Sequence, residues 1–109
     1  MAQVIINPVN KTCTPDPVLP KGRNATIVFK IDQSCKDWAW SGATPIVVTA
    51  PAGIFSGGDN PGGNGKGNVN VQDKNDDDTI YKYSATLIQD GAASAVTIDP
   101  DIQNDASSL

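Results

Sequence analysis

The chain has 109 residues, a length that suits one domain with a single modest hydrophobic core. Its 12 acidic residues, all aspartates, outnumber the 8 basic ones and give a net charge of −4. Proteins that bind nucleic acid or an anionic membrane do so through clustered Lys and Arg, and this sequence has no such cluster. We therefore expect neither nucleic acid nor a membrane among its partners.

Strand-forming residues dominate the composition. Val, Ile and Thr are frequent, whereas Leu is rare and Glu is absent. Asn, Asp, Gly and Pro recur at short intervals, as turns between short strands require. The sequence predicts an all-β protein in which residues 1–109 form a single β-sandwich of about seven strands. An immunoglobulin-like and a cupredoxin-like Greek key both fit this pattern.

The first half of the chain begins with a predicted strand at residues 2–6, and a proline-rich arm completes the segment 1–23. The run ATIVFKI, residues 25–31, alternates apolar and polar side chains and predicts the clearest early strand. Two further strands are predicted at residues 38–40 and within the run PIVVTAP, residues 45–51.

The second half begins with the glycine-rich segment GGDNPGGNGKG, residues 57–67, which we expect to be a mobile or turn-rich loop. It does not fit the phosphate-binding Walker motif, because glycine follows its lysine where Ser or Thr is required. Strands are then predicted around residues 69–71, at 80–88 and around 96–98. The chain ends in a polar tail, residues 102–109.

The absence of histidine excludes several kinds of chemistry. It removes Ser-His-Asp and Cys-His catalysis, histidine-bound zinc and a blue-copper site, so we expect a protein without enzymatic activity. Cys13 and Cys35 allow either a disulfide that ties the arm to the second strand or two free thiols. The N-terminus lacks the basic start and apolar stretch of a signal peptide, so the default expectation is a cytoplasmic protein.

The aspartate-rich stretch DKNDDDTIYKYSATL, residues 73–87, supports two interpretations. The first is a calcium loop, in which Asp73, Asn75 and Asp77 occupy the first three ligand positions. Asp78 stands where an EF-hand loop has glycine, and the closing Glu is missing. Calcium is therefore the alternative, and no other cofactor is expected.

The second interpretation makes the same turn structural, and it is the one that we favour. The spacing Asp77-x-Thr79-x-Tyr81-x-Tyr83 resembles the tyrosine corner of immunoglobulin-like sandwiches. Tyr81 would then donate a hydrogen bond to upstream backbone, and Tyr83 would occupy a core position. The aspartates would form a solvated turn.

The functional hypothesis is a non-catalytic interaction or accessory module that acts through surface loops on a protein partner or on a second copy of itself. The residues expected to bind the partner lie around the glycine-rich loop: Trp38, Trp40, Phe55, Asp59 and Asn60. The competing interpretation places both tryptophans in the core. Two other functions stay open, a calcium-stabilised domain that uses the turn 73–78 and a carbohydrate-binding module with an exposed tryptophan.

Three stretches together resemble a group of small, uncharacterised bacterial single-domain proteins. They are NATIVFKI, the aspartate-rich turn before YKYSATL, and TIDPDIQND. The group carries an I-x-W or I-x-F strand, a D-x-N-x-D-G turn before Y-x-Y, and a closing D-P-x-I-x-N-D motif. The similarity covers roughly residues 24–105 and implies an immunoglobulin-like or cupredoxin-like sandwich without a metal site. This chain departs from the group at Asp78, where the turn has glycine, and in its insertion 57–67.

Overall fold

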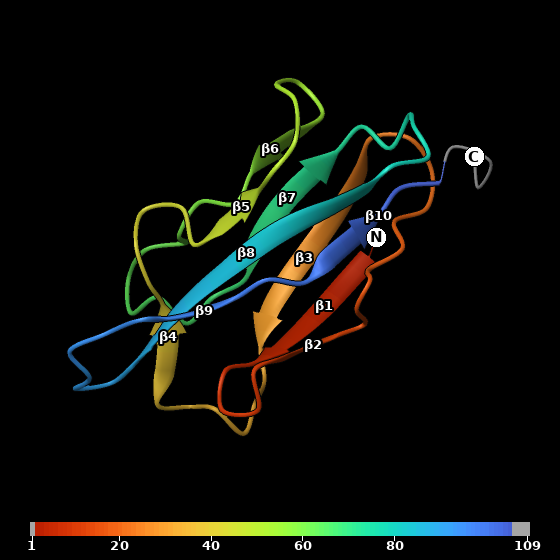
Figure 1. Ribbon diagram of the computed structural model, residues 1–109. Coiled ribbons are helices and arrows are strands. Elements are labelled where there is room, and N and C mark those ends of the chain that lie inside the picture. The colour runs from red at the N-terminus through yellow and green to blue at the C-terminus, as the bar shows by residue number, and fades with distance from the viewer. Residues whose placement is uncertain (1, 106–109) are drawn as a thin grey trace.

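The computed structural model describes residues 2–105 of the chain. Within this range ten strands form two sheets that pack face to face, and no helix is present that could span a membrane (Figure 1). The strands are β1 (Ala2–Asn7), β2 (Thr12–Thr14), β3 (Ala25–Ile31), β4 (Trp38–Trp40), β5 (Ile46–Val48), β6 (Phe55–Gly57), β7 (Val69–Asp73), β8 (Ile80–Gln89), β9 (Val96–Ile98) and β10 (Asp101–Gln103). The predicted all-β sandwich is confirmed.

The first sheet has the strand order β2-β1-β3-β7-β6. β1 runs parallel to β3, with Val4 opposite Phe29, and the other pairs are antiparallel. β7 alternates strictly between buried and exposed residues, so Val69, Val71 and Asp73 all point to the inner face. The strand period therefore places an aspartate in the same buried row as two valines.

The second sheet is built around β8, which pairs with four shorter strands. Ala85 pairs with Ile46 of β5 on one side and with Ile98 of β9 on the other. β4 continues the β5 side, and β10 continues the β9 side. Alternate residues of β8, among them Tyr83 and Leu87, are buried, as expected of a strand with one face on the core.

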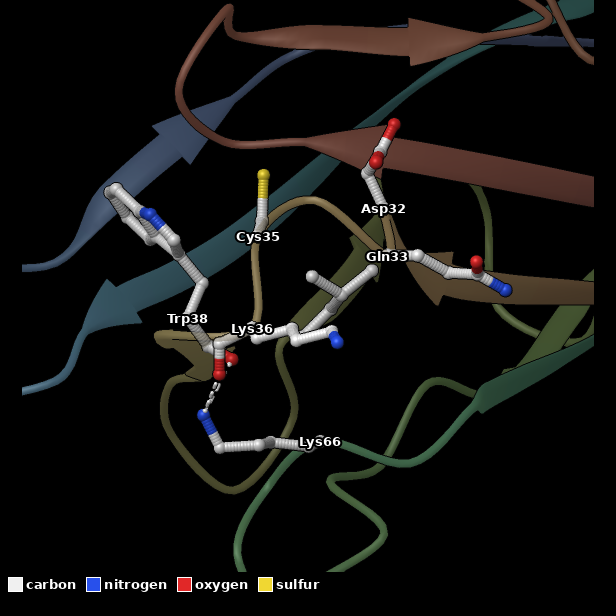
Figure 2. Close-up of a pocket in the computed structure, with 7 residues that line it drawn as sticks. Asp32, Gln33, Cys35, Lys36, Trp38 and Lys66 are labelled. Carbon is white, nitrogen blue, oxygen red and sulfur yellow. Dashed lines mark hydrogen bonds between the residues drawn. The ribbon is translucent and has the colours of Figure 1, made fainter.

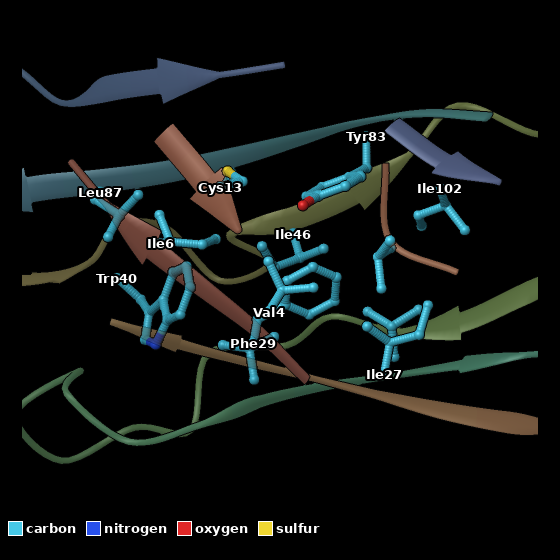
Figure 3. Packing of buried hydrophobic residues seen from close by; sticks show 14 of the residues in the cluster. Val4, Ile6, Cys13, Ile27, Phe29, Trp40, Ile46, Tyr83, Leu87 and Ile102 are labelled. Atoms are coloured by element: carbon cyan, nitrogen blue, oxygen red, sulfur yellow. The ribbon is translucent and has the colours of Figure 1, made fainter. Parts of the chain in front are cut away.

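The core lies between the two sheets and takes side chains from both (Figure 3). Phe29 of β3 packs edge-to-face on Tyr83 of β8, with ring centroids 5.1 Å apart. Around this pair lie enclosed aliphatic side chains, among them Val4, Ile6, Val18, Ile27, Ile46, Val69, Val71, Leu87 and Ile102. Residues from both ends of the chain thus enter one hydrophobic cluster.

The predicted count of about seven strands is too low. β2 lies in the segment 1–23 with the proline-rich arm, β6 ends at the first residue of the glycine-rich segment 57–67, and β10 overlaps the start of the predicted tail 102–109. Each has three residues and pairs with a longer neighbour, so it carries no alternation long enough to be recognised in the sequence. Residues 106–109 of the predicted tail lie outside the described residues, as does Met1.

Candidate functional site

The two tryptophans of β4 belong to the core. Ala39 turns outward between them, so the strand period places Trp38 and Trp40 on the same inner face, where they are 8 % and 3 % exposed. Trp40 Nε1 donates a hydrogen bond to the Gly67 carbonyl at 2.7 Å. The expectation of an exposed tryptophan is therefore wrong, and neither position presents a flat indole face on which a sugar ring could stack.

The glycine-rich segment is held against both sheets. The Gly58 N–H donates to the Asn70 carbonyl of β7 at 2.8 Å, and the Gly58 carbonyl accepts from the Ile46 N–H of β5 at 3.3 Å. Farther along, the Gly65 carbonyl accepts from the Trp40 N–H at 2.8 Å. The glycine-rich segment is therefore anchored by backbone hydrogen bonds near both of its ends.

The side chains of Asn60 and Asp59 form hydrogen bonds that hold the glycine-rich segment in place. Asn60 Nδ2 donates to the Gly42 carbonyl at 3.0 Å, and Asn60 Oδ1 accepts from the Gly62 N–H at 3.0 Å. Asp59 Oδ1 accepts from the Thr44 hydroxyl at 3.2 Å. The predicted role of Asn60 in partner binding therefore competes with bonds that already use both ends of its amide.

Phe55 is the aromatic among the expected binding residues that stays partly exposed. Its ring packs edge-to-face on Tyr81, with centroids 5.2 Å apart. It also lines two grooves, one of about 190 Å³ beside β5 and one of about 360 Å³ beside the end of β7. Phe55 thus lies apart from Trp38, and the five expected residues do not form one surface.

A pocket of about 390 Å³ lies beside Trp38 (Figure 2). It is lined by Ile31, Asp32, Gln33, Cys35, Lys36, Trp38 and Lys66. The turn after β3 supplies most of these residues, and the glycine-rich segment supplies Lys66. The sequence pointed to Trp38 and to this segment, but it gave no sign that the turn 32–36 completes a pocket with them.

Lys66 fixes one wall of this pocket. Its Nζ donates to the carbonyl oxygens of Lys36 at 2.6 Å and Trp38 at 3.3 Å (Figure 2), and it forms an ion pair with Asp90 at 3.3 Å. A cation that already has three acceptors holds the wall in place. Lys66 therefore acts as a structural element of the pocket.

Two other charges line the pocket. Asp32 Oδ1 accepts from the Ser34 backbone N–H at 2.9 Å and from its hydroxyl at 2.8 Å, and these bonds lower the pKa of Asp32. The carboxylate is therefore charged at neutral pH. The ammonium group of Lys36 forms no ion pair with any residue between 2 and 105. Beside the ion-paired Lys66, the pocket thus combines the anion of Asp32 and the cation of Lys36 with the apolar surfaces of Ile31 and Trp38.

Cys13 and Cys35 are buried free thiols, so the disulfide alternative is wrong and the free-thiol alternative holds. The two side chains face different neighbours. The Cys35 thiol donates to Asn7 Oδ1 at 3.5 Å, whereas Cys13 lies beside Tyr83 in the core (Figure 3). Burial raises the pKa of Cys13 to about 11, so this thiol stays protonated and unreactive at neutral pH.

The aspartate-rich turn forms a buried hydrogen-bond network with the end of the chain. Asp73 Oδ1 accepts from the Asn75 N–H at 2.9 Å and from Asn104 Nδ2 at 3.1 Å. The same Asn104 amide donates to Asp77 Oδ1 at 3.2 Å. Asp73, Asn75 and Asn104 are each at most 2 % exposed, so two residues of the expected solvated turn are buried, whereas Lys74, Asp76 and Asp78 are exposed as expected.

Asn75 joins a third segment to this network. Its Nδ2 donates to the carbonyl oxygens of Pro20 at 3.2 Å and Gly22 at 2.9 Å, and its Oδ1 accepts from the Asp105 N–H at 3.2 Å. Both ends of the amide are therefore used. Among the described residues, no three His, Cys, Asp or Glu side chains gather as metal ligands, and Asn75 is bound away from the carboxylates that a calcium loop would share with it.

The carboxylates of the turn differ in their pKa. Burial raises the pKa of Asp73, and the nearby charges of Asp77 and Asp76 add to this effect against its hydrogen bonds. For Asp77, burial acts in the same direction, but the hydrogen bonds from Tyr81, Thr79 and Asn104 outweigh it and lower the pKa. At neutral pH Asp77 is therefore an anion that is stabilised by its donors.

The two tyrosines of β8 have separate roles. Tyr83 is 1 % exposed and fills the predicted core position. The Tyr81 hydroxyl donates to Asp77 Oδ2 at 2.6 Å, four residues upstream, so its partner is a carboxylate rather than the predicted backbone oxygen. The short link has the same effect as a tyrosine corner, because it closes the turn that leads into β8.

Sequence reasoning missed Asn104, which bridges two carboxylates. The signal was present in the closing stretch TIDPDIQND, whose last two residues, Asn104 and Asp105, are the ones that contact the turn. Two of the three stretches that carry the resemblance to the bacterial group are thus in contact.

Comparison of the chain with models of known protein families finds no match. Comparison with curated protein sequences finds no match either. The functional argument accordingly rests on the residues and contacts described above.

Proposed function

We propose that the protein is a non-catalytic interaction module that binds a protein partner at the pocket beside Trp38. The observation that carries this proposal is the make-up of the pocket, where Ile31 and Trp38 meet the opposite charges of Asp32 and Lys36. Such a surface suits a peptide segment whose apolar side chain is flanked by charged or polar ones. The apolar surfaces provide contact area, and the two charges orient the bound segment.

Preorganisation of the pocket supports the same proposal. The three contacts of the Lys66 ammonium fix the wall formed by Lys36 and Trp38, and the two bonds from Ser34 fix the carboxylate of Asp32. A partner that docks here orders few groups of the pocket, so less conformational entropy is lost on binding. Lys36 is the charged group that is left to meet an acidic side chain of the partner.

We also propose that the strand order is cupredoxin-like and that the chain is related to the bacterial group that it resembles. The parallel pairing of β1 with β3 supports the first point, because immunoglobulin-like sandwiches consist of two antiparallel sheets. The contact between the aspartate-rich turn and the closing motif supports the second, because it gives both motifs one structural purpose.

The proposal predicts that reversal of the charge at Lys36 prevents partner binding. The purified protein serves as bait for a lysate of its native host, in parallel with the variants Lys36→Glu and Lys21→Glu. Both lysines are exposed, but Lys21 lies outside the pocket. We expect wild type and Lys21→Glu to retain the same protein, and Lys36→Glu to bind it at least about tenfold more weakly, because the charge would now repel the partner.

The retained protein is then purified and its dissociation constant is measured for each variant. Circular dichroism of the variants controls for folding. Equal affinities for Lys36→Glu and wild type would place the interaction elsewhere and overturn the proposed site. Parallel experiments in calcium and in EDTA separate this interaction from the calcium alternative, because binding at the pocket does not involve the turn 73–78.

A further inference from the structure

β9 leaves one edge of the second sheet open. Val96, Thr97 and Ile98 pair with β8 on one side. Among residues 2–105, no other strand or loop donates or accepts a backbone hydrogen bond at the other side of β9. Thr86, the residue opposite Thr97, bonds to Pro45 and Ser41 on the other side of β8. Within β9, Thr97 is therefore the residue whose N–H and C=O groups point outward without a partner.

The other edges of the second sheet are covered in whole or in part. Along β10, the Val18 N–H donates to the Asp101 carbonyl at 3.0 Å, and the Gln103 N–H donates to the Val18 carbonyl at 2.9 Å. Along β5 and β4, the carbonyls of Gly58 and Gly65 accept the outward N–H groups of Ile46 and Trp40, whereas among residues 2–105 the outward N–H of Val48 has no backbone partner. β9 thus differs from β10, β4 and β5 in that no described segment bonds to its outer edge at all.

The edges of the first sheet are interrupted by residues that oppose strand pairing. β2 is followed directly by Pro15, which has no N–H to donate. β6 ends at Gly57 and is followed by Gly58, both with φ near +90°, so the backbone leaves the extended conformation. Proline and sharp changes of backbone direction are common protections of edge strands.

β9 itself contains none of these protections, and the nearest charged residue and proline after it are Asp99 and Pro100. The stretch GAASAVTI, residues 91–98, contains neither a charged residue nor proline. Val96 and Ile98 pack only partly against the core, while Thr97 points outward and is exposed. A strand edge that is uncharged and half-covered is the kind to which another strand adds.

We propose that β9 pairs antiparallel with β9 of a second copy of this chain, about a two-fold axis at Thr97. This register places Val96 of each copy opposite Ile98 of the other, on the face that continues the core. The partly buried side chains then complete their burial against each other. The interface is self-complementary, as a two-fold dimer requires.

Charge does not oppose a second copy at this edge. The chain carries a net charge of −4, so two copies repel each other over most approaches. In the register centred on Thr97, the nearest acidic residue, Asp99, lies opposite the small and neutral Ala95. No like charges are directly opposed, and the pocket beside Trp38 takes no part in the contact.

Sedimentation velocity tests the proposal, with the 11.4 kDa monomer as reference. We expect wild type to change from monomer to dimer as its concentration rises. Thr97→Lys and Thr97→Glu should each stay monomeric, because identical charges meet at the axis, and an equimolar mixture of the two should form a heterodimer. Val47→Lys is the control, since Val47 is exposed on β5 at the far side of β8, and it should dimerise like wild type.

Hydrogen exchange of the wild type tests the same edge without a substitution. The outward amide of Thr97 should exchange more slowly at high concentration than after dilution. Wild type that is monomeric at all concentrations overturns the proposal, as does a Thr97 amide whose exchange ignores concentration. A dimer lost in Val47→Lys but kept in both Thr97 variants also overturns it, because the sheet face would then be the interface.

Discussion

Asp73 is a buried carboxylate with one oxygen bonded and the other without a partner. Oδ1 accepts two hydrogen bonds, whereas Oδ2 has no hydrogen-bond partner among the described residues. The Asn104 Oδ1 atom is likewise buried without one. A buried polar atom without a partner costs about 1–3 kcal/mol, so this position is a weak point of the fold at neutral pH.

We predict that the free energy of unfolding of Asp73→Asn improves relative to that of wild type as the pH rises from acidic to neutral. Burial raises the pKa of Asp73, so the folded protein holds this proton more tightly than the unfolded chain. The stabilisation that comes from this tighter proton binding is present below the ordinary pKa of about 3.9. It is lost as the pH rises through the raised pKa of Asp73. Asn does not titrate, and it keeps an oxygen that accepts the bonds from Asn75 and Asn104.

Urea unfolding at pH 4 and at pH 7 measures this effect. Between these two pH values, the stability of Asp73→Asn should improve relative to wild type by on the order of 1 kcal/mol, the cost of one unsatisfied acceptor. Asp76→Asn is the matched control, because Asp76 is exposed in the same turn. If both variants shift in parallel with wild type, the carboxylate of Asp73 carries no burial penalty.

Among the elements, the junction after β6 depends on one glycine. Gly58 bonds to β7 of the first sheet through its N–H and to β5 of the second sheet through its carbonyl. Its φ is +88°, and a Cβ at this position would lie 2.2 Å from the Ile46 carbonyl oxygen. No side chain other than hydrogen fits, so the two sheets can approach here only through glycine.

We predict that Gly58→Ala destabilises the domain far more than Gly62→Ala. Both glycines have positive φ, which costs alanine roughly 1–2 kcal/mol. A Cβ on Gly62 meets open space, whereas the methyl group at position 58 adds an overpacking cost of about 1–3 kcal/mol. Thermal and urea unfolding of the two variants measure the difference. Equal losses of stability would show that the junction relaxes without cost.

The sequence predicts the longer elements because the strand period is visible within them. The alternation of ATIVFKI gives β3 with its observed bounds, and the run from Ile80 gives most of β8. The same period shows that Trp38 and Trp40 share a face, but not whether that face is the core. β6 ends in glycine and has no alternation, so only its pairing with β7 makes it a strand.

The candidate site was less accessible to sequence reasoning because its residues are distant in the chain. Lys66 lies 28 residues after Trp38 and reaches it only because the glycine-rich segment is anchored to Trp40. Asn104 reaches Asp73 across 31 residues. Such contacts depend on the paths of loops, and those paths follow from backbone hydrogen bonds that composition and spacing do not encode.

For the whole molecule, one polar network closes an end of the sandwich. The arm at Pro20 and Gly22, the turn at Asn75 and the chain end at Asp105 gather at the same end of the molecule (Figure 1), where the amide of Asn75 bonds to all three of the other residues. The network therefore fastens both terminal segments to the turn before β8. This arrangement provides by hydrogen bonds what a calcium ion would provide by coordination.

We predict that calcium does not change the melting temperature. The Asn104 amide donates to both Asp73 and Asp77, at 3.1 and 3.2 Å, and its N–H groups occupy the side of these carboxylates that a shared cation would need. Asn75 Oδ1 is bound to the Asp105 N–H. A real site at about 100 times its dissociation constant would add roughly 2.7 kcal/mol, which raises the melting temperature of a domain this size by several degrees.

Calorimetric melting in calcium chloride, in magnesium chloride and in EDTA checks this prediction, with Asp77→Asn as the ligand variant. Identical melting curves are expected for wild type. A cation could bind only by displacing the Asn104 hydrogen bonds, and the loss of these bonds would offset the free energy of cation binding. If calcium alone raises the melting temperature of wild type but not that of Asp77→Asn, the hydrogen-bond network does not close this end permanently. That result would mean that Asn104 moves aside, and that its unpartnered Oδ1 turns to the ion together with Asp73 Oδ2.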